Sequence, residues 1–151
     1  VDAGPSKRAM KAFFDTNVIV HAFDASAPAK RTVAQRLFAQ CAADGTLLLS
    51  VQVLQEFYVT VTRKLERRLP EDEAVAAVES LSAFPVVATD APMVLAALNT
   101  HRRAAISFWD AMIIRSAAQL GCAMLWSEEL NGGQVYEGVR VINPFAEPEK
   151  G

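Results

Sequence analysis

The sequence has few of the residues on which several common kinds of site depend. Only two of its 151 residues are cysteines, and Cys41 and Cys122 lack the Cys-x-x-Cys spacing of a zinc or redox site. The two histidines, His21 and His101, are far apart and unaccompanied, which argues against a histidine-based metal site. No Ser-His-Asp or Cys-His pattern and no glycine-rich phosphate loop is present. We expect both cysteines to be reduced core thiols of a cytoplasmic protein.

Long apolar runs are also missing. No stretch approaches the ~20 apolar residues that cross a bilayer, so no membrane association is expected. With 52% hydrophobic residues, the chain is nevertheless long enough to bury a core of its own. Residues 1–9 are polar and turn-forming, and we interpret them as a leader added for expression, followed by a single domain over 10–151. The net charge of −2 means that a nucleic-acid ligand would need a local basic patch or bound cations.

Hydrophobic periodicity predicts short strands alternating with helices. The expected strands lie at 11–14, 46–49, 85–88, 122–126 and 139–142. The expected helices lie at 29–43, from a cap at Ser50 to a point before Pro70, and at 71–83, 91–101 and 108–120. This order favours an α/β fold with a mainly parallel sheet covered by helices on both faces.

Two aspartates interrupt this pattern at the ends of elements. Asp15 follows the first strand between apolar residues, where a buried charge is costly unless it is paired or bound to a cation. Alternatively, Asp15 or Asn17 caps a short helix. Asp110 follows Ser107 by three residues, which resembles a capping box at the start of a helix. Its apolar neighbours, however, leave that helix start little exposed surface.

Three glutamates extend the set of candidate acids. Glu56 lies beside the apolar stripe of its helix, although a helical glutamate is often only a solvated surface residue. Glu128 and Glu129 follow the fourth strand and precede a turn, which is also compatible with a polar loop. A parallel sheet would bring such element ends together at one edge. Clustered carboxylates favour Mg²⁺ or Mn²⁺, and those metals, by activating a water, suit phosphodiester hydrolysis.

Four separated motifs resemble those of PIN-domain proteins, in the same order along nearly the whole chain. They are DTNV at 15–18, QEF at 55–57, FWDAMI at 108–113 and LWSEEL at 125–130. The closing VRVINPF at 139–145 resembles the VapC-like toxin branch in particular. The resemblance implies a three-layer α/β/α sandwich and a metal-dependent endoribonuclease. It further implies the toxin of a type II toxin–antitoxin pair, usually dimeric and silenced by a small cognate antitoxin.

The resemblance also implies roles for individual residues. Glu129 stands where this branch commonly has aspartate, and Glu128 is the reserve candidate for that fourth acid. The implied metal ligands and supporting residues are Asp15, Glu56, Asp110 and Glu129, with Thr16, Asn17 and Ser127 shaping the site.

Two basic clusters are candidates for contacts with the RNA backbone, or else are solvated helix ends. The first comprises Arg63, Lys64, Arg67 and Arg68, and the second Arg102 and Arg103. Arg115 is the single base that we expect nearest the carboxylates. An antitoxin would lay an amphipathic helix into a groove, whose walls we expect to be the helices following Asp15 and Ser50.

Two other functions remain open from the sequence. One is a catalytically weak or inactive PIN-fold module that binds RNA or regulates, having lost activity through the altered fourth acid. The other is a phosphatase of the haloacid-dehalogenase kind, suggested by an aspartate after the first strand. That chemistry needs a second aspartate two residues on, where this chain has Asn17.

Overall fold

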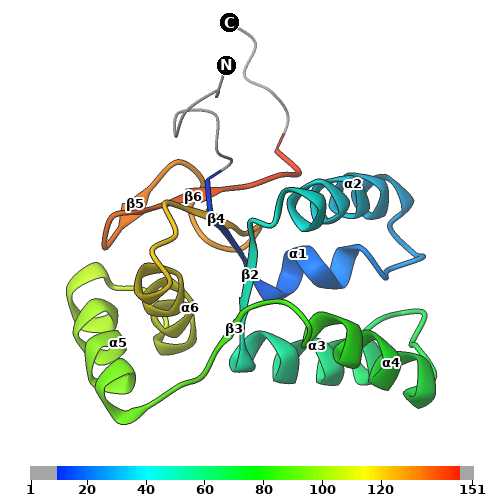
Figure 1. Ribbon diagram of the computed structural model, residues 1–151, viewed down its shortest axis with the longest axis horizontal. Coiled ribbons are helices and arrows are strands. Elements are labelled where there is room, and N and C mark those ends of the chain that lie inside the picture. The colour runs from blue at the N-terminus through cyan, green and yellow to red at the C-terminus, as the bar shows by residue number, and fades with distance from the viewer. Residues whose placement is uncertain (1–9, 147–151) are drawn as a thin grey trace, which may run out of the picture.

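The computed structural model describes residues 10–146, which form one sheet with helices on both sides (Figure 1). The strand order is β3-β2-β1-β4-β6-β5, and every neighbouring pair is parallel except β5 with β6. The strands are β1 Ala12–Phe14, β2 Leu47–Ser50, β3 Val86–Val87, β4 Met124–Trp126, β5 Val135–Tyr136 and β6 Val139–Ile142. The mainly parallel sheet expected from the sequence is confirmed.

The central strands are short and apolar because they are covered on both faces. All three residues of β1 and all four of β2 are buried, so neither strand has a solvent-facing side. The helices α1 to α4 lie to one side of the sheet and α5 and α6 to the other (Figure 1). They are α1 Thr16–His21, α2 Pro28–Asp44, α3 Val51–Arg63, α4 Glu71–Leu81, α5 Ala91–Ala104 and α6 Phe108–Gln119. This is the expected three-layer α/β/α arrangement.

Several helix boundaries follow the expected local signals. The Ser50 hydroxyl accepts a hydrogen bond from the Val53 amide and caps α3. Gly45 ends α2 in the left-handed conformation, with a φ of 70°, which glycine adopts without strain. α3, by contrast, ends at Arg63, well before Pro70. The amides of Leu65 and Leu69 turn back to bond carbonyl oxygens of that helix, so the chain folds onto α3 and does not extend it.

Of these elements, β5 was absent from the sequence prediction, whereas α1 was expected as the alternative in which Asp15 or Asn17 caps a short helix. β5 is a two-residue strand that pairs with β6 across a tight turn at Glu137 and Gly138, both with positive φ. α1 is the short helix that capping by Asp15 would produce. Within residues 10–146 no helix is long and apolar enough to span a membrane. Cys41 and Cys122 are buried and free, as expected. The expected leader, residues 1–9, lies outside the described residues.

Candidate active site

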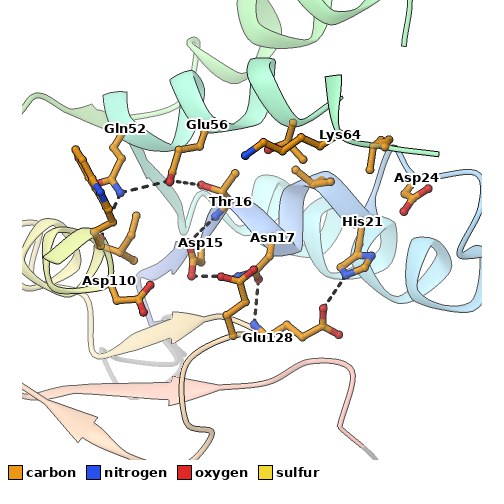
Figure 2. Close-up of a pocket in the computed structure, with 16 residues that line it drawn as sticks. Asp15, Thr16, Asn17, His21, Asp24, Gln52, Glu56, Lys64, Asp110 and Glu128 are labelled. Atoms are coloured by element: carbon orange, nitrogen blue, oxygen red, sulfur yellow. Dashed lines mark hydrogen bonds and ion pairs between the residues drawn. The ribbon is translucent and has the colours of Figure 1, made fainter. Parts of the chain in front are cut away.

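A polar cavity of about 430 Å³ lies where β1, α3, α6 and the segment after β4 meet. Its walls include Asp15 after β1, Glu56 on α3, Asp110 on α6, and both Glu128 and Glu129 after β4. Figure 2 shows the side chains of Asp15, Glu56 and Asp110 around this space. Parallel pairing of β1 with β4 sets Phe14 beside Trp126, so the residues that follow both strands emerge at the same edge.

Asp15 is the most buried of these acids and has a full set of hydrogen bonds. Its carboxylate accepts from the Thr16 amide at 2.7 Å, the Ser127 hydroxyl at 2.8 Å and the Asn17 side-chain amide at 3.2 Å. Burial raises the pKa of Asp15 to about 7, and the nearby Glu56 and Asp110 carboxylates add to this, against the lowering effect of Ser127 and Thr16. Asp15 therefore both caps α1 and brings a costly buried charge to the cavity.

Glu56 is joined to the first turn of α1. Its Oε1 accepts a hydrogen bond from the Thr16 hydroxyl at 2.9 Å and from the Gln52 side-chain amide at 3.3 Å. These bonds link α3 to the residue next to Asp15, and Figure 2 shows the chain of contacts from Gln52 through Glu56 to Thr16. Although exposed, Glu56 thus points into the cavity and is not a freely solvated helix residue.

Asp110 takes part both in the cap of α6 and in the wall of the cavity, the two possibilities left open by the sequence. Its main-chain amide donates to the Ser107 hydroxyl at 3.0 Å, which forms the N-cap of α6. Its carboxylate lines the cavity and helps to raise the pKa of Asp15. Capping fixes the start of α6 through the serine and the main chain, so the aspartate side chain remains available to the site.

Glu128 and Glu129 differ in what holds them. The Glu128 carboxylate contacts His21 Nε2 at 2.8 Å and Lys30, and its main-chain amide donates to Asn17 at 3.0 Å. Burial alone would raise the pKa of Glu128, but Lys30 and His21 together lower it. Glu129 is exposed and lines the cavity, with no side-chain hydrogen bond or ion pair among residues 10–146. The geometry favours Glu129 as the available fourth acid.

The oxygen-only donor set suits a hard divalent cation such as Mg²⁺ or Mn²⁺. The buried Asp15, whose charge is disfavoured by burial and by two neighbouring carboxylates, is the kind of group that a cation stabilises. As placed, however, the acids do not converge: the part of the chain that the structure describes holds no group of three His, Cys, Asp or Glu side chains close enough to bind one ion. The site fits a divalent metal in chemistry, and full ligation requires its side chains to draw together.

The basic residues expected to hold RNA are spread over different surfaces. Lys64 lines the cavity, whereas the exposed Arg63, Arg67 and Arg68 do not. Arg102 and Arg103 lie beside Leu95 and Leu98 on α5.

The expectation that Arg115 would lie nearest the carboxylates was wrong. Its Nε donates to Thr100 at 2.7 Å and its guanidinium lies 3.4 Å from Glu137, which also pairs with Arg103. Glu137 belongs to the turn between β5 and β6. Arg115 therefore ties α6 to this hairpin and does not line the cavity.

Eight residues that line the cavity were not identified from the sequence as site residues: Val20, His21, Asp24, Gln52, Thr60, Leu65, Trp109 and Ile113. One signal could have found Gln52. Four polar residues of α3 and its end, Gln52, Glu56, Thr60 and Lys64, recur every four positions and so share one face of the helix. We call this set the α3 polar stripe. His21 was set aside as unaccompanied, but it lies next to Glu128, 107 positions away in the sequence.

Comparison with known families agrees with this geometry. The family model of the PIN domain matches residues 12–130, which carry all five acids described above. The chain belongs to the PIN-domain family. Members of this family generally use a divalent metal, in keeping with the oxygen-only donor set.

Solved structures with the same fold include a toxin and a chain of a toxin–antitoxin complex. VapC20 of Mycobacterium tuberculosis, a toxin that cleaves the sarcin–ricin loop, is 21% identical with a TM-score of 0.61, over 79% of this chain and 90% of VapC20. A chain of a Klebsiella pneumoniae toxin–antitoxin complex is 18% identical with a TM-score of 0.65, covering 89% and 98%. A chain of FitAB bound to a DNA fragment is 16% identical with a TM-score of 0.66, covering 93% and 99%. No curated protein matches the sequence. The resemblance to VapC-like PIN proteins is confirmed at the level of the fold.

Proposed function

We propose that this PIN-domain protein is a Mg²⁺- or Mn²⁺-dependent endoribonuclease and the toxin of a toxin–antitoxin pair. The observation that supports this best is the meeting of Asp15, Glu56 and Asp110, from three separate elements, around one cavity. The acid with the least solvent, Asp15, is already fixed by three hydrogen bonds. Such preorganisation is costly for the fold and is typical of a catalytic site.

The residues that would hold the metal are Asp15, Glu56, Asp110 and Glu129. When bound, a divalent metal supplies charge to phosphate oxygens and lowers the pKa of a water, which allows hydrolysis of a phosphodiester bond. Thr16, Asn17 and Ser127 orient Asp15 through their hydrogen bonds. Lys64 is the basic side chain that attracts a phosphate of the RNA into this acidic cavity. Glu128, whose carboxylate contacts Lys30 and His21, shapes the wall opposite α3.

The proposed partners are an RNA substrate, a small antitoxin and a second copy of this chain in a cytoplasmic complex. The Klebsiella pneumoniae structure is a toxin–antitoxin complex, which supports an antitoxin by analogy. An apolar groove between α3 and α4, here called the α3–α4 groove, offers a place for an amphipathic antitoxin helix. Its apolar lining is Leu54, Tyr58, Val59, Val75 and Val78. The sequence prediction placed the walls of the antitoxin groove at the helices following Asp15 and Ser50, which are α1 and α3, whereas this groove lies between α3 and α4.

The test is RNA cleavage by the purified, antitoxin-free protein with Mg²⁺ or Mn²⁺, with EDTA, and in the Asp15→Asn variant. We expect EDTA to abolish cleavage and Asp15→Asn to lower it by about 10³-fold, as loss of several kcal/mol of metal-dependent stabilisation predicts. Metal binding by calorimetry is measured in parallel. Absence of divalent-metal binding contradicts the proposal.

The same experiment separates the two alternatives. RNA binding without cleavage under any divalent metal identifies a non-catalytic RNA-binding module. A phosphate trapped on Asp15 identifies a phosphatase. The structure offers no support for the phosphatase, because the Asn17 side chain donates to Asp15 and accepts from the Glu128 amide, so it makes the contacts of an amide.

A further inference from the structure

Trp109 is exposed beside the catalytic acids and has no role in the site as described so far. Its side chain is 62% exposed, although it directly precedes Asp110 and lines the same cavity. An indole offers a large, flat apolar surface with a polar N–H, and tryptophan is enriched at binding surfaces for this reason. The core of the protein does not require it, so its position calls for a functional explanation.

The position of Trp109 is fixed although its ring is exposed. Its carbonyl oxygen accepts a hydrogen bond from the Gln52 side chain at 3.3 Å, and its ring packs edge-to-face on Phe108 with centroids 5.1 Å apart. Gln52 is itself buried and also bonds Glu56. The start of α6 is therefore tied to the same glutamine that bonds Glu56, and the Trp109 ring packs on its neighbour Phe108.

The charge of the cavity indicates which part of an RNA can meet this ring. Six acidic side chains line the cavity, and Lys64 is the one lysine or arginine among the lining residues within 10–146. Phosphates are repelled by this surface except near Lys64 and bound metal ions. A nucleobase is uncharged and presents a flat face. Single-stranded nucleic acids are commonly held by bases that stack on exposed aromatic side chains.

We propose that Trp109 is a stacking platform for an unpaired base that flanks the scissile phosphate of the RNA. Gln52, which contacts Trp109, and Lys64 stand at opposite ends of the α3 polar stripe, roughly 18 Å apart at ~1.5 Å per helical residue. The RNA strand then runs along α3, with a base on Trp109, the reacting phosphate at the carboxylates and a further phosphate at Lys64. This inference rests on the proposed ribonuclease function and defines its substrate as single-stranded at the cut.

The test is a double-mutant cycle between Trp109→Ala and single abasic positions in the RNA. The probe is a short single-stranded oligoribonucleotide that the wild-type protein cuts at one bond, with each flanking base removed in turn. Binding is measured in the Asp15→Asn background so that the probe stays intact. We expect Trp109→Ala to weaken binding roughly tenfold. At one flanking position, removing the base should weaken binding roughly tenfold when the protein has Trp109. It should leave the affinity almost unchanged when the protein carries Trp109→Ala.

Control variants separate stacking from other effects. Trp109→Phe keeps a smaller aromatic face and should restore part of the affinity. Leu95→Ala removes another exposed apolar side chain, 67% exposed on α5 and outside the cavity, and should change nothing. Trp109→Ala should leave the slope of affinity against salt unchanged, whereas Lys64→Ala should reduce it. Circular dichroism of each variant verifies folding.

Several outcomes overturn the inference without touching the proposed function. Wild-type protein that cleaves RNA while Trp109→Ala binds and cleaves equally well rules out a base platform. An equal loss of affinity on every abasic probe shows that Trp109 contacts no particular base. Unchanged RNA binding with weakened inhibition by an antitoxin assigns the indole to the protein partner. Failure of the wild-type protein to cleave RNA with any divalent metal, in contrast, counts against the proposed function itself.

Discussion

Two sides of α3 differ in chemistry, although both belong to one helix of 13 residues whose C-cap is Lys64. On one side, the α3 polar stripe places Glu56 and Lys64 in the wall of the acidic cavity, among other polar and charged side chains. The α3–α4 groove on another side is lined mainly by aliphatic side chains and one tyrosine. Between them, Val53, Phe57 and Val61 are completely buried in the core. Under the proposed function, one helix serves stability, catalysis and recognition through separate rows of residues, and mutations in each row should affect these three properties separately.

The largest expected effect on stability comes from the buried side of α3, formed by Val53, Phe57 and Val61. Phe57→Ala removes a fully buried ring that packs edge-to-face with Phe23 at 5.1 Å. We expect a loss of about 3–5 kcal/mol in the free energy of unfolding. Urea denaturation measures it, with Val59→Ala on the exposed side of the same helix as the matched control. Equal destabilisation by the two variants would show that the buried and exposed sides of α3 contribute equally to the free energy of unfolding.

Unlike the buried side of α3, the cavity that the α3 polar stripe lines is expected to lower stability, through Asp15 at the end of β1. Because the native pKa of Asp15 is about 7 and its ordinary value is 3.8, the native state holds more protons than the unfolded state between these values. The unfolding free energy therefore falls as pH rises through this window. Asp15→Asn removes the penalty, so in EDTA this variant should be more stable than wild type at pH 8, by up to a few kcal/mol, and should lose its advantage near pH 4.

Denaturation at several pH values, with and without Mg²⁺, measures this effect. Added Mg²⁺ should stabilise the wild-type protein and leave Asp15→Asn unchanged, because ligand binding to the native state raises its stability. If the difference in unfolding free energy between wild type and Asp15→Asn is the same at pH 4 and pH 8, burial does not raise the pKa of Asp15.

A smaller effect, on RNA cleavage, is expected to distinguish Glu128 from Glu129, the two neighbouring glutamates that follow β4. Glu129→Gln should lower cleavage by about 10- to 100-fold and weaken metal binding, as expected for a metal ligand or its close support. Glu128→Gln keeps its size and should lower cleavage less, because its charge is directed to His21 and Lys30. Kinetic assays with a titration of Mg²⁺ distinguish them. A larger loss for Glu128→Gln would reverse the assignment.

The smallest effect on the isolated protein is expected in the α3–α4 groove. Val59 is 42% exposed, so Val59→Lys should change the free energy of unfolding by no more than about 0.5 kcal/mol and leave cleavage unaltered. In cells, the variant should remain toxic but escape neutralisation by the cognate antitoxin. A growth assay with both proteins expressed measures this. Full rescue by the antitoxin would place its helix elsewhere.

Local signals in the sequence were sufficient for much of the fold and for the acids. The buried strands, the caps at Ser50 and Ser107 and the glycine after α2 depend on a few neighbouring residues. Asp15 and Asp110 were found because a carboxylate among apolar residues is costly and therefore conspicuous. For these features, short-range physics is enough.

The remaining features depend on contacts between distant parts of the chain. The contact that distinguishes the surroundings of Glu128 from those of Glu129 comes from Lys30, which is 98 positions from Glu128. Arg115 was misplaced because its partner Glu137 lies in a hairpin turn that has little sequence signal. Trp109 looked like an ordinary apolar residue at a helix start, and only its exposed surface distinguishes it from core. None of these could be read from a local pattern.

Under the proposed function, the double role of Asp15 bears on how the activity can be lost during evolution. The same carboxylate accepts the capping hydrogen bond from Thr16 and provides the charge at the centre of the cavity. Replacement by asparagine or serine removes the charge and keeps an oxygen for the cap, whereas alanine also gives up roughly 1 kcal/mol of capping. A lineage that loses the activity therefore has a path, through asparagine, on which the fold is retained or even gains stability. Inactive descendants of this protein are expected to carry a capping residue at position 15.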